Sequence, residues 1–310
     1  VNGCVYCPYH GQNKTIKRKK LTQEEIVQEV MALQDMGHKR LALELGEDPV
    51  HNPIEYVLES IKTIYSVHHK NGDIRRVNVN IAATTVENYR KLKEAGIGTY
   101  ILFQETYHKE SYLQLHPTGP KHDYDYHTEA MDRAMQGGID DVGLGVLFGL
   151  ELYMYEFVGL LMHAEHLEAV HGVGPHTISV PRIKKAADID PTAFDNGISD
   201  EIFAKLCALI RISVPYTGMI ISTRESEQMR TRALKLGITE PATVLQKTGA
   251  GILPVDILPL ENGDYEIRMT QGEISVEPLD CVEEWLCSAL GIELGDLRED
   301  CPIAIASTGH

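Results

Sequence analysis

The sequence of 310 residues has no long apolar run and comparatively little positive charge. No apolar stretch reaches the ~18 residues that a membrane-spanning helix needs. Lys and Arg number 29 against 45 Asp and Glu, for a formal net charge of −16. Nucleic acids and anionic membranes attract clustered Lys and Arg. The composition therefore argues against both as partners, and the basic run from Lys17 to Lys20 is predicted to be a solvated surface.

The sequence also lacks a dense cysteine framework. Small disulfide-stabilised secreted domains concentrate many cysteines in a short chain. This chain spreads six cysteines over its length, and we therefore expect a reducing cytoplasm as its location. Cys207 lies in an apolar helical stretch and is predicted to be a core residue. The six cysteines are Cys4, Cys7, Cys207, Cys281, Cys287 and Cys301.

The middle of the chain alternates strand-like and helix-like segments from Leu21 to about Gly237. The first helix is predicted to begin after an N-cap at Thr22, with Glu25 three residues on, and to stop at Gly37. Strands rich in Val, Ile and Leu between such helices predict a parallel α/β sheet that forms a (β/α) barrel. We place the barrel over residues 1–239. The region 240–310 is predicted to be an atypical appendage, β-rich and punctuated by Pro and Gly, with one short helix around Trp285.

Polar residues that directly follow the predicted strands are the candidates for chemistry. In parallel barrels the active site gathers at the carboxyl ends of the strands. The candidates selected on this basis are Glu47, Asp48, Asn80, Glu105, Ser179, Arg182, Thr223 and Arg224.

Two cysteines open the chain in the segment V-N-G-C-V-Y-C-P-Y-H. Cys4 and Cys7 have C-x-x-C spacing, which lets two thiolates on one tight loop bind a single metal centre. Tyr6 between them favours an iron–sulfur cluster. A zinc half-site and a redox dithiol remain open readings of the pair alone, although no second ligand pair at zinc spacing lies nearby in the sequence.

Carboxylates follow two of the strands. The segment G-E-D-P, with Gly46, Glu47 and Asp48, could bind an amino group. Asp48 could equally cap the next helix ahead of Pro49. The segment F-Q-E-T places Glu105 where it could accept hydrogen bonds from ribose hydroxyls, or where it is a plain surface carboxylate.

A later strand, G-P-H-T-I-S-V-P-R, carries His176, Ser179 and Arg182. Residues 176 and 182 are an even step apart and are predicted to share one face, with Ser179 on the other unless the chain bends near Pro181. An Arg fork fits a carboxylate, and an inward His can bind iron. A solvated strand end is the alternative. His163 and His166, three apart on a helix, are predicted to be surface or packing residues rather than a metal pair.

Taken together, these segments resemble a known family. The chain is similar, over about residues 1–238, to the tyrosine-cleaving radical S-adenosylmethionine (SAM) maturase of the FeFe-hydrogenase and, less closely, to the tyrosine lyase of thiamine biosynthesis. The segments that carry the resemblance are C-V-Y-C-P-Y-H, L-x-L-G-E-D-P, V-N-V-N-I-A, F-Q-E-T-Y-H, L-H-P-x-G-P-K, G-V-G-P-H-T-I-S-V-P-R and P-Y-T-G-M-I-I-S-T-R-E-S.

The resemblance implies a radical SAM barrel with a 4Fe–4S cluster on Cys4 and Cys7. It places Tyr6 by the adenine of SAM. It also assigns the other site residues, which fall into three sets: Gly46, Glu47, Asp48, Asn80 and Glu105 for SAM; Ser179 and Arg182 for tyrosine; and His176 near a possible auxiliary iron. Reductive cleavage of SAM would yield a radical that takes hydrogen from L-tyrosine. The Cα–Cβ bond then breaks to p-cresol and dehydroglycine, which feeds carbon monoxide and cyanide synthesis.

The same resemblance implies partners: an electron donor such as ferredoxin or flavodoxin, and the other hydrogenase maturases. Three departures from the family pattern stand out. The first cysteine of the cluster motif and the first barrel strand are expected before Val1. Met154 occupies the place of a basic residue that could meet the carboxylate of SAM. Cys281, Cys287 and Cys301 do not have the spacing of the second-cluster motif, and we expect them to be structural.

Other readings remain open beside this one. The chain could be a thiamine-type tyrosine lyase, a barrel that binds no cluster and is inactive, or a hydrolase with zinc at Cys4 and Cys7. A second iron–sulfur cluster is not supported by the spacing in the tail.

Overall fold

The structure is a computed structural model that describes residues 1–70, 72–185 and 189–241, together with the short segments 255–259, 265–269, 275–278 and 304–307. The chain divides into two compact units, Val1–Ala242 and Thr243–His310. Cys281, Cys287, Cys301 and the predicted helix around Trp285 lie outside the described residues. The predicted domain boundary after residue 239 stays a prediction.

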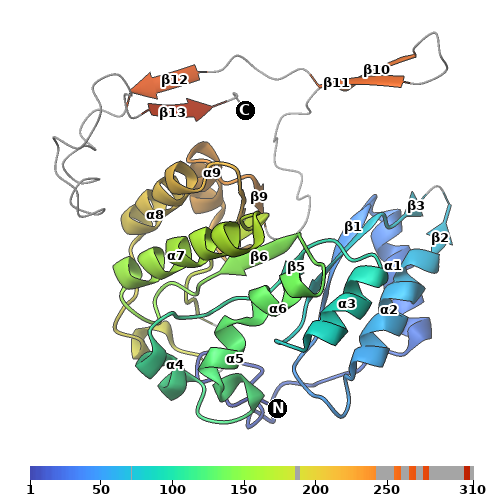
Figure 1. Cartoon of the computed structure of the whole chain (residues 1–310), viewed down its shortest axis with the longest axis horizontal. Helices are drawn as coiled ribbons and strands as arrows, with labels where there is room; N and C mark the ends of the chain where they lie inside the picture. Colours follow the sequence, from blue (N-terminus) through green and yellow to red (C-terminus); the bar gives the residue numbers. More distant parts are fainter. Residues whose placement is uncertain are drawn as a thin grey trace. The chain divides into compact units, whose positions relative to one another are not determined.

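A seven-stranded parallel sheet forms the centre of the first unit (Figure 1). Its strands pair in the order in which they follow one another along the chain, apart from the two short strands of a separate hairpin. The sheet curls, with β1 and β9 as its two edges, and the predicted parallel α/β barrel architecture is confirmed in this open form. The strands are β1 (Arg40–Glu44), β4 (Arg76–Asn80), β5 (Tyr100–Ile101), β6 (Val142–Gly145), β7 (Thr177–Ser179), β8 (Gly218–Ile221) and β9 (Glu240–Pro241).

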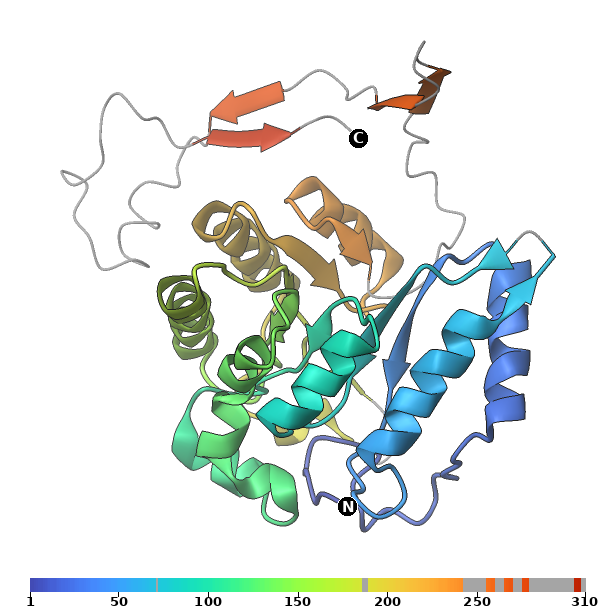
Figure 2. The same cartoon turned by 45° about the vertical axis from the view of Figure 1, so that its right-hand side comes forward.

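Helices cover the outer face of the curled sheet (Figures 1 and 2). The first of them begins as predicted, with a capping box in which Thr22 and Glu25 each accept a hydrogen bond from the other's backbone N–H. The helices are α1 (Gln23–Asp35), α2 (Ile54–Ser66), α3 (Val86–Glu94), α4 (Lys109–Leu115), α5 (Tyr124–Thr128), α6 (Ala130–Gln136), α7 (Tyr153–His171), α8 (Asp200–Ser213) and α9 (Glu227–Lys235), with two short 3-10 turns, η1 (Pro120–His122) and η2 (Pro191–Ala193).

Two helices differ from the limits that their sequence pattern predicts. The pattern predicts a helix from about Pro53 to His69, but α2 ends at Ser66, because β2 (His68–His69) pairs with β3 (Gly72–Asp73) as a small antiparallel hairpin. The pattern also predicts one helix over residues 127–138, but the chain is divided at Glu129 into α5 and α6.

The core lies between the sheet and its helices. Val77, Val79 and Val142 on the strands are fully buried, as are Leu92 and Leu160 on the helices that cover them. Burial of such side chains stabilises a fold by roughly 25 cal/mol per Å² of apolar surface. Cys207 belongs to this core, as predicted.

The described part of the second unit is antiparallel β-structure. Strand β10 (Val255–Pro259) pairs with β11 (Tyr265–Met269), and β12 (Ser275–Pro278) pairs with β13 (Ala304–Ser307). This agrees with the β-rich pattern predicted for the region. Across the described part of the whole chain, the helices fall short of the length and apolar character that crossing a bilayer requires.

Candidate functional site

The two amino-terminal cysteines lie on a tightly wound loop. The N–H of Cys7 bonds the carbonyl of Cys4 at 3.2 Å, and the N–H of His10 bonds the carbonyl of Cys7 at 3.1 Å. Cys4 is 6% exposed and packs with Leu115 and Leu150, whereas Cys7 is half-buried. The two thiols form no disulfide. Both thiols can therefore act as soft sulfur ligands from one loop, and an iron–sulfur centre needs ligands of this kind.

Arg18 fixes the far side of this loop. Its guanidinium donates to the carbonyls of Tyr9 at 3.1 Å, His10 at 2.7 Å and Asn13 at 2.8 Å. Lys20 lies 4.1 Å from the centre of the Tyr56 ring. All four residues from Lys17 to Lys20 are exposed, so the predicted solvated surface is confirmed, and Arg18 and Lys20 make their contacts from that surface.

A second loop, residues 115–122, forms a platform for the cysteine loop. Two backbone bonds join them, from Gly3 N to the Thr118 carbonyl and from Val5 N to the Leu115 carbonyl, both at 3.0 Å. Gly119 has a φ of +95°, and a Cβ there would lie 2.3 Å from Asn2 Oδ1. Only glycine meets both conditions without strain.

The platform also fixes Tyr6. The Nδ1 of His116 lies 2.7 Å from the Tyr112 carbonyl, and its Nε2 lies 2.8 Å from the Tyr6 hydroxyl. Because a carbonyl only accepts, Nδ1 carries the hydrogen and the Tyr6 hydroxyl donates to Nε2. Burial, assisted by the positive charge of Lys121, lowers the pKa of His116 to about 4, so it stays neutral in this pair.

Lys121 supplies positive charge beneath the cysteine loop. Its Nζ donates to Glu105 Oε1 at 2.6 Å, and the two side chains are only 16% and 13% exposed. Burial raises the pKa of the Cys4 thiol, and the nearby Lys121 ammonium partly counters that rise. The Glu105 carboxylate, predicted to meet a ribose, therefore lies in an ion pair close to the cysteines.

Glu105 has a strained backbone with a φ of +70°, which is uncommon for a residue with a side chain. The segment after it is held by Glu156, which is fully buried. The Glu156 carboxyl accepts from the Thr106 hydroxyl and, at 2.9 Å, from Tyr107 N. Burial raises the pKa of Glu156 to about 7.

The G-E-D-P segment divides into two roles. Glu47 accepts from Asn2 Nδ2 at 2.5 Å and so contacts the cysteine loop. One carboxylate oxygen of Asp48 lies 2.7 Å from His51 Nδ1. The other accepts hydrogen bonds from the backbone N–H groups of Val50 and His51. These bonds to His51 hold the pKa of Asp48 below its usual range. Asp48 therefore serves the local turn, while Gly46 is exposed with open space around it.

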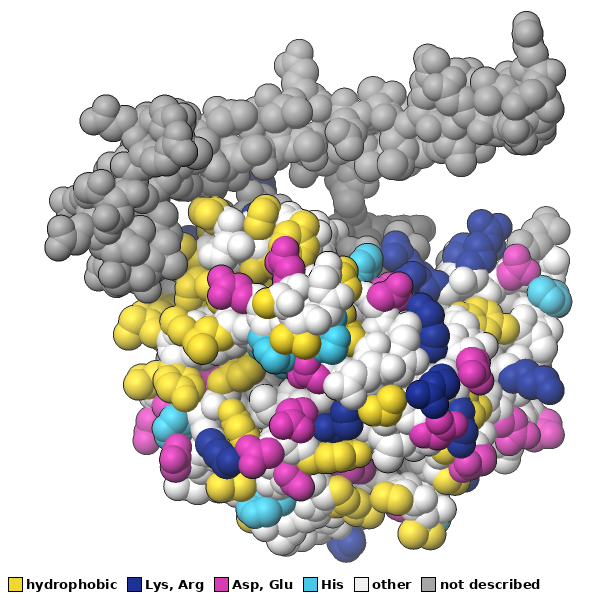
Figure 3. All heavy atoms as spheres, in the orientation of Figure 1, with side chains coloured by type: hydrophobic (Ala, Val, Ile, Leu, Met, Phe, Trp, Pro, Cys, Tyr) yellow, Lys and Arg dark blue, Asp and Glu magenta, His cyan; other side chains and the backbone are white. Residues whose placement is uncertain are grey.

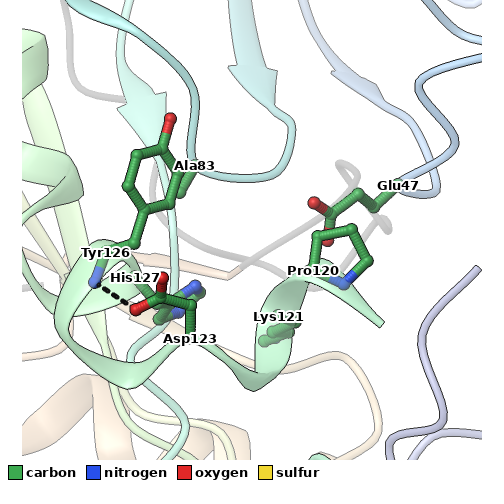
Figure 4. A pocket seen from close by; sticks show the side chains of 7 residues that line it. All are labelled: Glu47, Ala83, Pro120, Lys121, Asp123, Tyr126 and His127. Carbon is green, nitrogen blue, oxygen red and sulfur yellow. Dashed lines mark hydrogen bonds between the residues drawn. The ribbon is translucent and has the colours of Figure 1, made fainter. Parts of the chain in front are cut away.

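A pocket brings Glu47 and Lys121 together (Figure 4). Asp123 accepts a hydrogen bond from the backbone N–H of Tyr126 at its rim. Asn80, at the end of β4, is half-buried and pairs in register with Glu44, three residues before Glu47. The lining residues are Glu47, Ala83, Pro120, Lys121, Asp123, Tyr126 and His127.

Ser179 and Arg182 lie at the carboxyl end of β7, where both are buried. The Arg182 guanidinium is held by a nearly complete set of partners. Its Nε bonds Glu225 Oε1 at 2.8 Å, and its Nη2 bonds Asp200 Oδ1 at 2.8 Å as well as the second Glu225 oxygen. The Ile198 carbonyl accepts from Nη1 at 3.2 Å. Four of the five N–H groups are thus used within the protein, which leaves one N–H unpaired among the described residues.

Sequence reasoning missed Glu225. Of three consecutive polar residues after β8, Thr223 and Arg224 are exposed, and Glu225 is 3% exposed. Lys184 Nζ also lies 3.1 Å from the second Glu225 oxygen.

His176 lies at the amino-terminal end of β7, the end of the strand opposite to Ser179 and Arg182. Its N–H bonds the Val142 carbonyl and its carbonyl accepts from Gly218 N, both at the amino ends of their strands. The side chain is exposed, whereas Arg182 is buried. The prediction that these two residues share a face stays a prediction, because β7 has only three residues and ends before Arg182.

His163 and His166 turn to different partners. His163 Nδ1 lies 3.0 Å from the Tyr107 hydroxyl, and His166 Nε2 lies 2.9 Å from Asp132 Oδ1. Within the described residues no three His, Cys, Asp or Glu side chains converge as metal ligands. The two thiols of Cys4 and Cys7 therefore remain the metal-binding candidates in that part of the chain.

Met154 is 59% exposed on α7. Tyr155, Val158 and Met162 on the same helix are exposed as well, and Figure 3 shows many exposed apolar side chains on the face that it views. The cation near Glu105 comes instead from Lys121.

Comparison with known proteins gives a consistent picture. Residues 1–161 match the model of the Radical SAM superfamily, and residues 179–253 match the Biotin and Thiamin Synthesis associated domain. A crystal structure of HydG, a maturase of the [FeFe]-hydrogenase, is 61% identical with a TM-score of 0.76, and covers 78% of this chain and 53% of its own. The HydG structure from Carboxydothermus hydrogenoformans is 44% identical with a TM-score of 0.73, covering 78% and 55%.

The 2-iminoacetate synthase of Salmonella typhimurium is 30% identical over 257 residues, which are 81% of this chain and 64% of that protein. The chain thus spans between about half and two thirds of the length of these relatives.

Proposed function

The chain belongs to the radical SAM superfamily, and we propose that it cleaves L-tyrosine between Cα and Cβ to p-cresol and dehydroglycine. The observation that carries this proposal is the meeting of the Cys4–Cys7 loop with the carboxylates Glu47 and Glu105 at the carboxyl edge of the sheet. Similarity to HydG at 61% and 44% identity supports the choice of tyrosine.

Membership of this superfamily implies a 4Fe–4S cluster and SAM as cofactors. A reduced cluster and SAM together supply one-electron, hydrogen-abstracting chemistry, which can open an unactivated carbon–carbon bond. Cys4 and Cys7 would hold the cluster. The buried contacts of Cys4 with Leu115 and Leu150 keep water from that side of the loop.

Each remaining residue has a task that its contacts support. The Tyr6 ring is held edge-on by His116, so it offers a fixed wall for the adenine. Glu47 and the pocket around it suit the methionyl amine, and Glu105 suits ribose hydroxyls. Gly46, Asp48 and Asn80 shape the loops beside them, with Asp48 acting on the turn rather than on the ligand.

The tyrosine end of the site is proposed at Ser179 and Arg182. The Ser179 hydroxyl forms no hydrogen bond with another described residue, and Arg182 retains one N–H beyond its four bonds. An amino acid carboxylate could join both donors. His176, at the amino-terminal end of β7, is proposed as a ligand of a separate auxiliary iron.

The proposal is tested by anaerobic reconstitution with iron and sulfide, in protein that carries a cysteine immediately before Val1. Incubation with SAM, tyrosine and a reductant should yield p-cresol. About four irons per chain and charge-transfer absorption are expected. Stoichiometric zinc without that absorption would indicate the hydrolase, and a chain that holds neither metal would indicate an inactive barrel.

The proposed tyrosine-binding residues are tested with a variant that keeps a positive charge beside Glu225. Arg182→Lys retains the charge but loses the fork, and Ser179→Ala removes the free hydroxyl. Both should raise the KM for tyrosine while the cluster spectrum is unchanged. A normal KM in both variants contradicts the assignment.

The thiamine-type lyase remains the second candidate because 2-iminoacetate synthase matches 81% of the chain. Both activities give p-cresol. Carbon monoxide and cyanide release, with dependence on other hydrogenase maturases, would support the hydrogenase role, and their absence with full p-cresol yield would support the thiamine role. A ferredoxin or flavodoxin is proposed as electron donor, and a reducing cytoplasm as the location.

A further inference from the structure

Lys121 is a buried ammonium that no assignment made so far uses. Its Nζ lies 2.6 Å from Glu105 Oε1 and 6.0 Å from the centre of the Tyr6 ring. It thus lies between two residues proposed to contact SAM and below the loop that carries the two thiols.

The backbone of Lys121 is fixed on both sides. Its N–H donates to Asn2 Oδ1 at 3.0 Å, and its carbonyl accepts from the Tyr112 hydroxyl at 2.7 Å. A surface lysine loses up to about 2 kcal/mol of side-chain entropy when it is ordered. Here the folded loops have already ordered it, so the ammonium is in place before any ligand arrives.

The charge of Lys121 acts on the cysteines as well as on Glu105. Its Nζ lies 6.0 Å from the centre of the ring of Tyr6, the residue directly before Cys7. Burial alone would lower the pKa of the Lys121 ammonium, but its charged neighbours, Glu105 first among them, outweigh that effect, and the pKa is raised. One cation therefore lies beside both the cysteine loop and the carboxylate.

Glu105 gives independent geometric support. Its φ of +70° is strained, and such strain persists only where the surroundings impose it. Glu156 holds the following two residues, and Lys121 holds the side chain. The protein thus fixes this carboxylate from both sides of the turn.

We propose that Lys121 is a positioning residue that couples the two halves of the cofactor site. It holds Glu105 in the place where SAM is recognised, and its charge favours the reduced, more negative state of the cluster on Cys4 and Cys7. This inference rests on the proposed function, since it requires that the site hold both cofactors.

The first test measures the midpoint potential of the reconstituted cluster by an EPR-monitored titration with dithionite, without SAM or tyrosine. Lys121→Met removes a positive charge, so reduction should become harder and the potential more negative. Glu105→Gln removes a negative charge and should shift it the opposite way. The double variant should return close to the wild-type potential. Lys109→Met is the matched control, because Lys109 is half-exposed and paired with Asp125, and it should have no effect.

The second test measures SAM binding to the same holoenzymes by equilibrium dialysis. Loss of a charge-assisted hydrogen bond to Glu105 should weaken SAM binding by about tenfold in Lys121→Met. Lys121→Arg keeps the charge and should restore most of the affinity.

Several results would overturn the proposal. A wild-type potential and SAM affinity in Lys121→Met would show that Lys121 only fills space. If Lys121→Met does not retain iron, the iron content of Lys121→Arg is measured next. Iron retained in Lys121→Arg supports a role for the positive charge, whereas iron lost in Lys121→Arg shows that only the shape of the lysine side chain matters and overturns the proposal. A wild-type holoenzyme that binds SAM but forms no p-cresol would refute the proposed function. The midpoint potentials and SAM affinities of the variants would still test the role of Lys121.

Discussion

Two groups of charged side chains lie at the carboxyl edge of the same sheet, and they differ in how completely their charges are satisfied. Around Arg182 the charges balance: Glu225 and Asp200 face Arg182 and Lys184, and the central pair is almost fully buried. Around Cys4 the Lys121–Glu105 pair balances only while the thiols carry no charge. We call the first group the closed network, because its charges balance within the protein although one Arg182 N–H is left over. We call the second the incomplete group, because metal-binding thiolates there need added positive charge, which iron ions would bring.

The largest expected effect comes from removing a thiol of the incomplete group. Cys4→Ala or Cys7→Ala should abolish iron binding and p-cresol formation, since each removes one of two cluster ligands in the described residues. Iron and sulfide assays after anaerobic reconstitution measure this. Cys207→Ala is the control: burial raises the pKa of Cys207 to about 12, so its thiol stays protonated, and its loss should leave the iron content unchanged. Retained iron in both loop variants would refute the cluster site.

The next largest effect concerns the closed network. Glu225→Ala leaves the Arg182 guanidinium without its bidentate partner in a buried place, which should cost about 3–5 kcal/mol of unfolding free energy. Denaturant unfolding measures it. Asp200→Asn removes another partner of the same guanidinium, but the Asp200 side chain is 60% exposed, so the cost should stay below about 1 kcal/mol. Equal costs for the two variants would mean that the network is not closed as described.

Glu156 offers a smaller effect with a characteristic pH dependence. Burial raises its pKa from 4.5 to about 7, so the folded state binds its proton more tightly than the unfolded state. Its contribution to stability is therefore full below pH 4.5 and is lost as the pH rises through about 7, by roughly 3 kcal/mol in total. Gln resembles the protonated acid, and Glu156→Gln should remove this slope.

The pH dependence of the unfolding free energy that is due to Glu156 is obtained as the difference between the wild type and Glu156→Gln. Burial lowers the pKa of His116 to about 4 and that of His127 to about 3. These two histidines oppose Glu156, because their contribution is present above pH 6.5 and is lost as the pH falls. Unfolding measured between pH 5 and 8 in both proteins isolates the carboxyl, and parallel curves would contradict the raised pKa.

The comparison also shows what sequence reasoning could reach. Strand–helix alternation and the Thr22 cap gave the parallel architecture and a correct helix start, because both depend on neighbours along the chain. Cys4, Tyr6, Glu47 and Glu105 were found as motif residues. Their geometry now brings them to one place, whereas their proposed roles remain predictions.

What sequence reasoning missed depends on contacts between distant segments. His116 meets Tyr6 across 110 residues of sequence, and the sequence alone assigns no chemistry to the loop that carries His116 and Lys121. Nothing in a run of Thr223, Arg224 and Glu225 shows which one is buried. The shortness of β7, which separated His176 from Arg182, is likewise set by the surrounding sheet.

The smallest expected effect tests how the platform supports the incomplete site. Gly119 and Gly37 have similar left-handed backbones, with φ of +95° and +88°, so alanine at either should cost about 1 kcal/mol in backbone strain. They differ in their surroundings: a Cβ at Gly119 meets Asn2 at 2.3 Å, whereas a Cβ at Gly37 meets nothing within 4 Å. Gly37→Ala should therefore lower stability without changing iron retention. Gly119→Ala should lower stability by a similar amount or slightly more and also make the cluster more labile to a chelator, because the cysteine loop is pushed from its platform. Equal chelator half-lives in the two variants would show that the cysteine loop holds its cluster without residues 115–122.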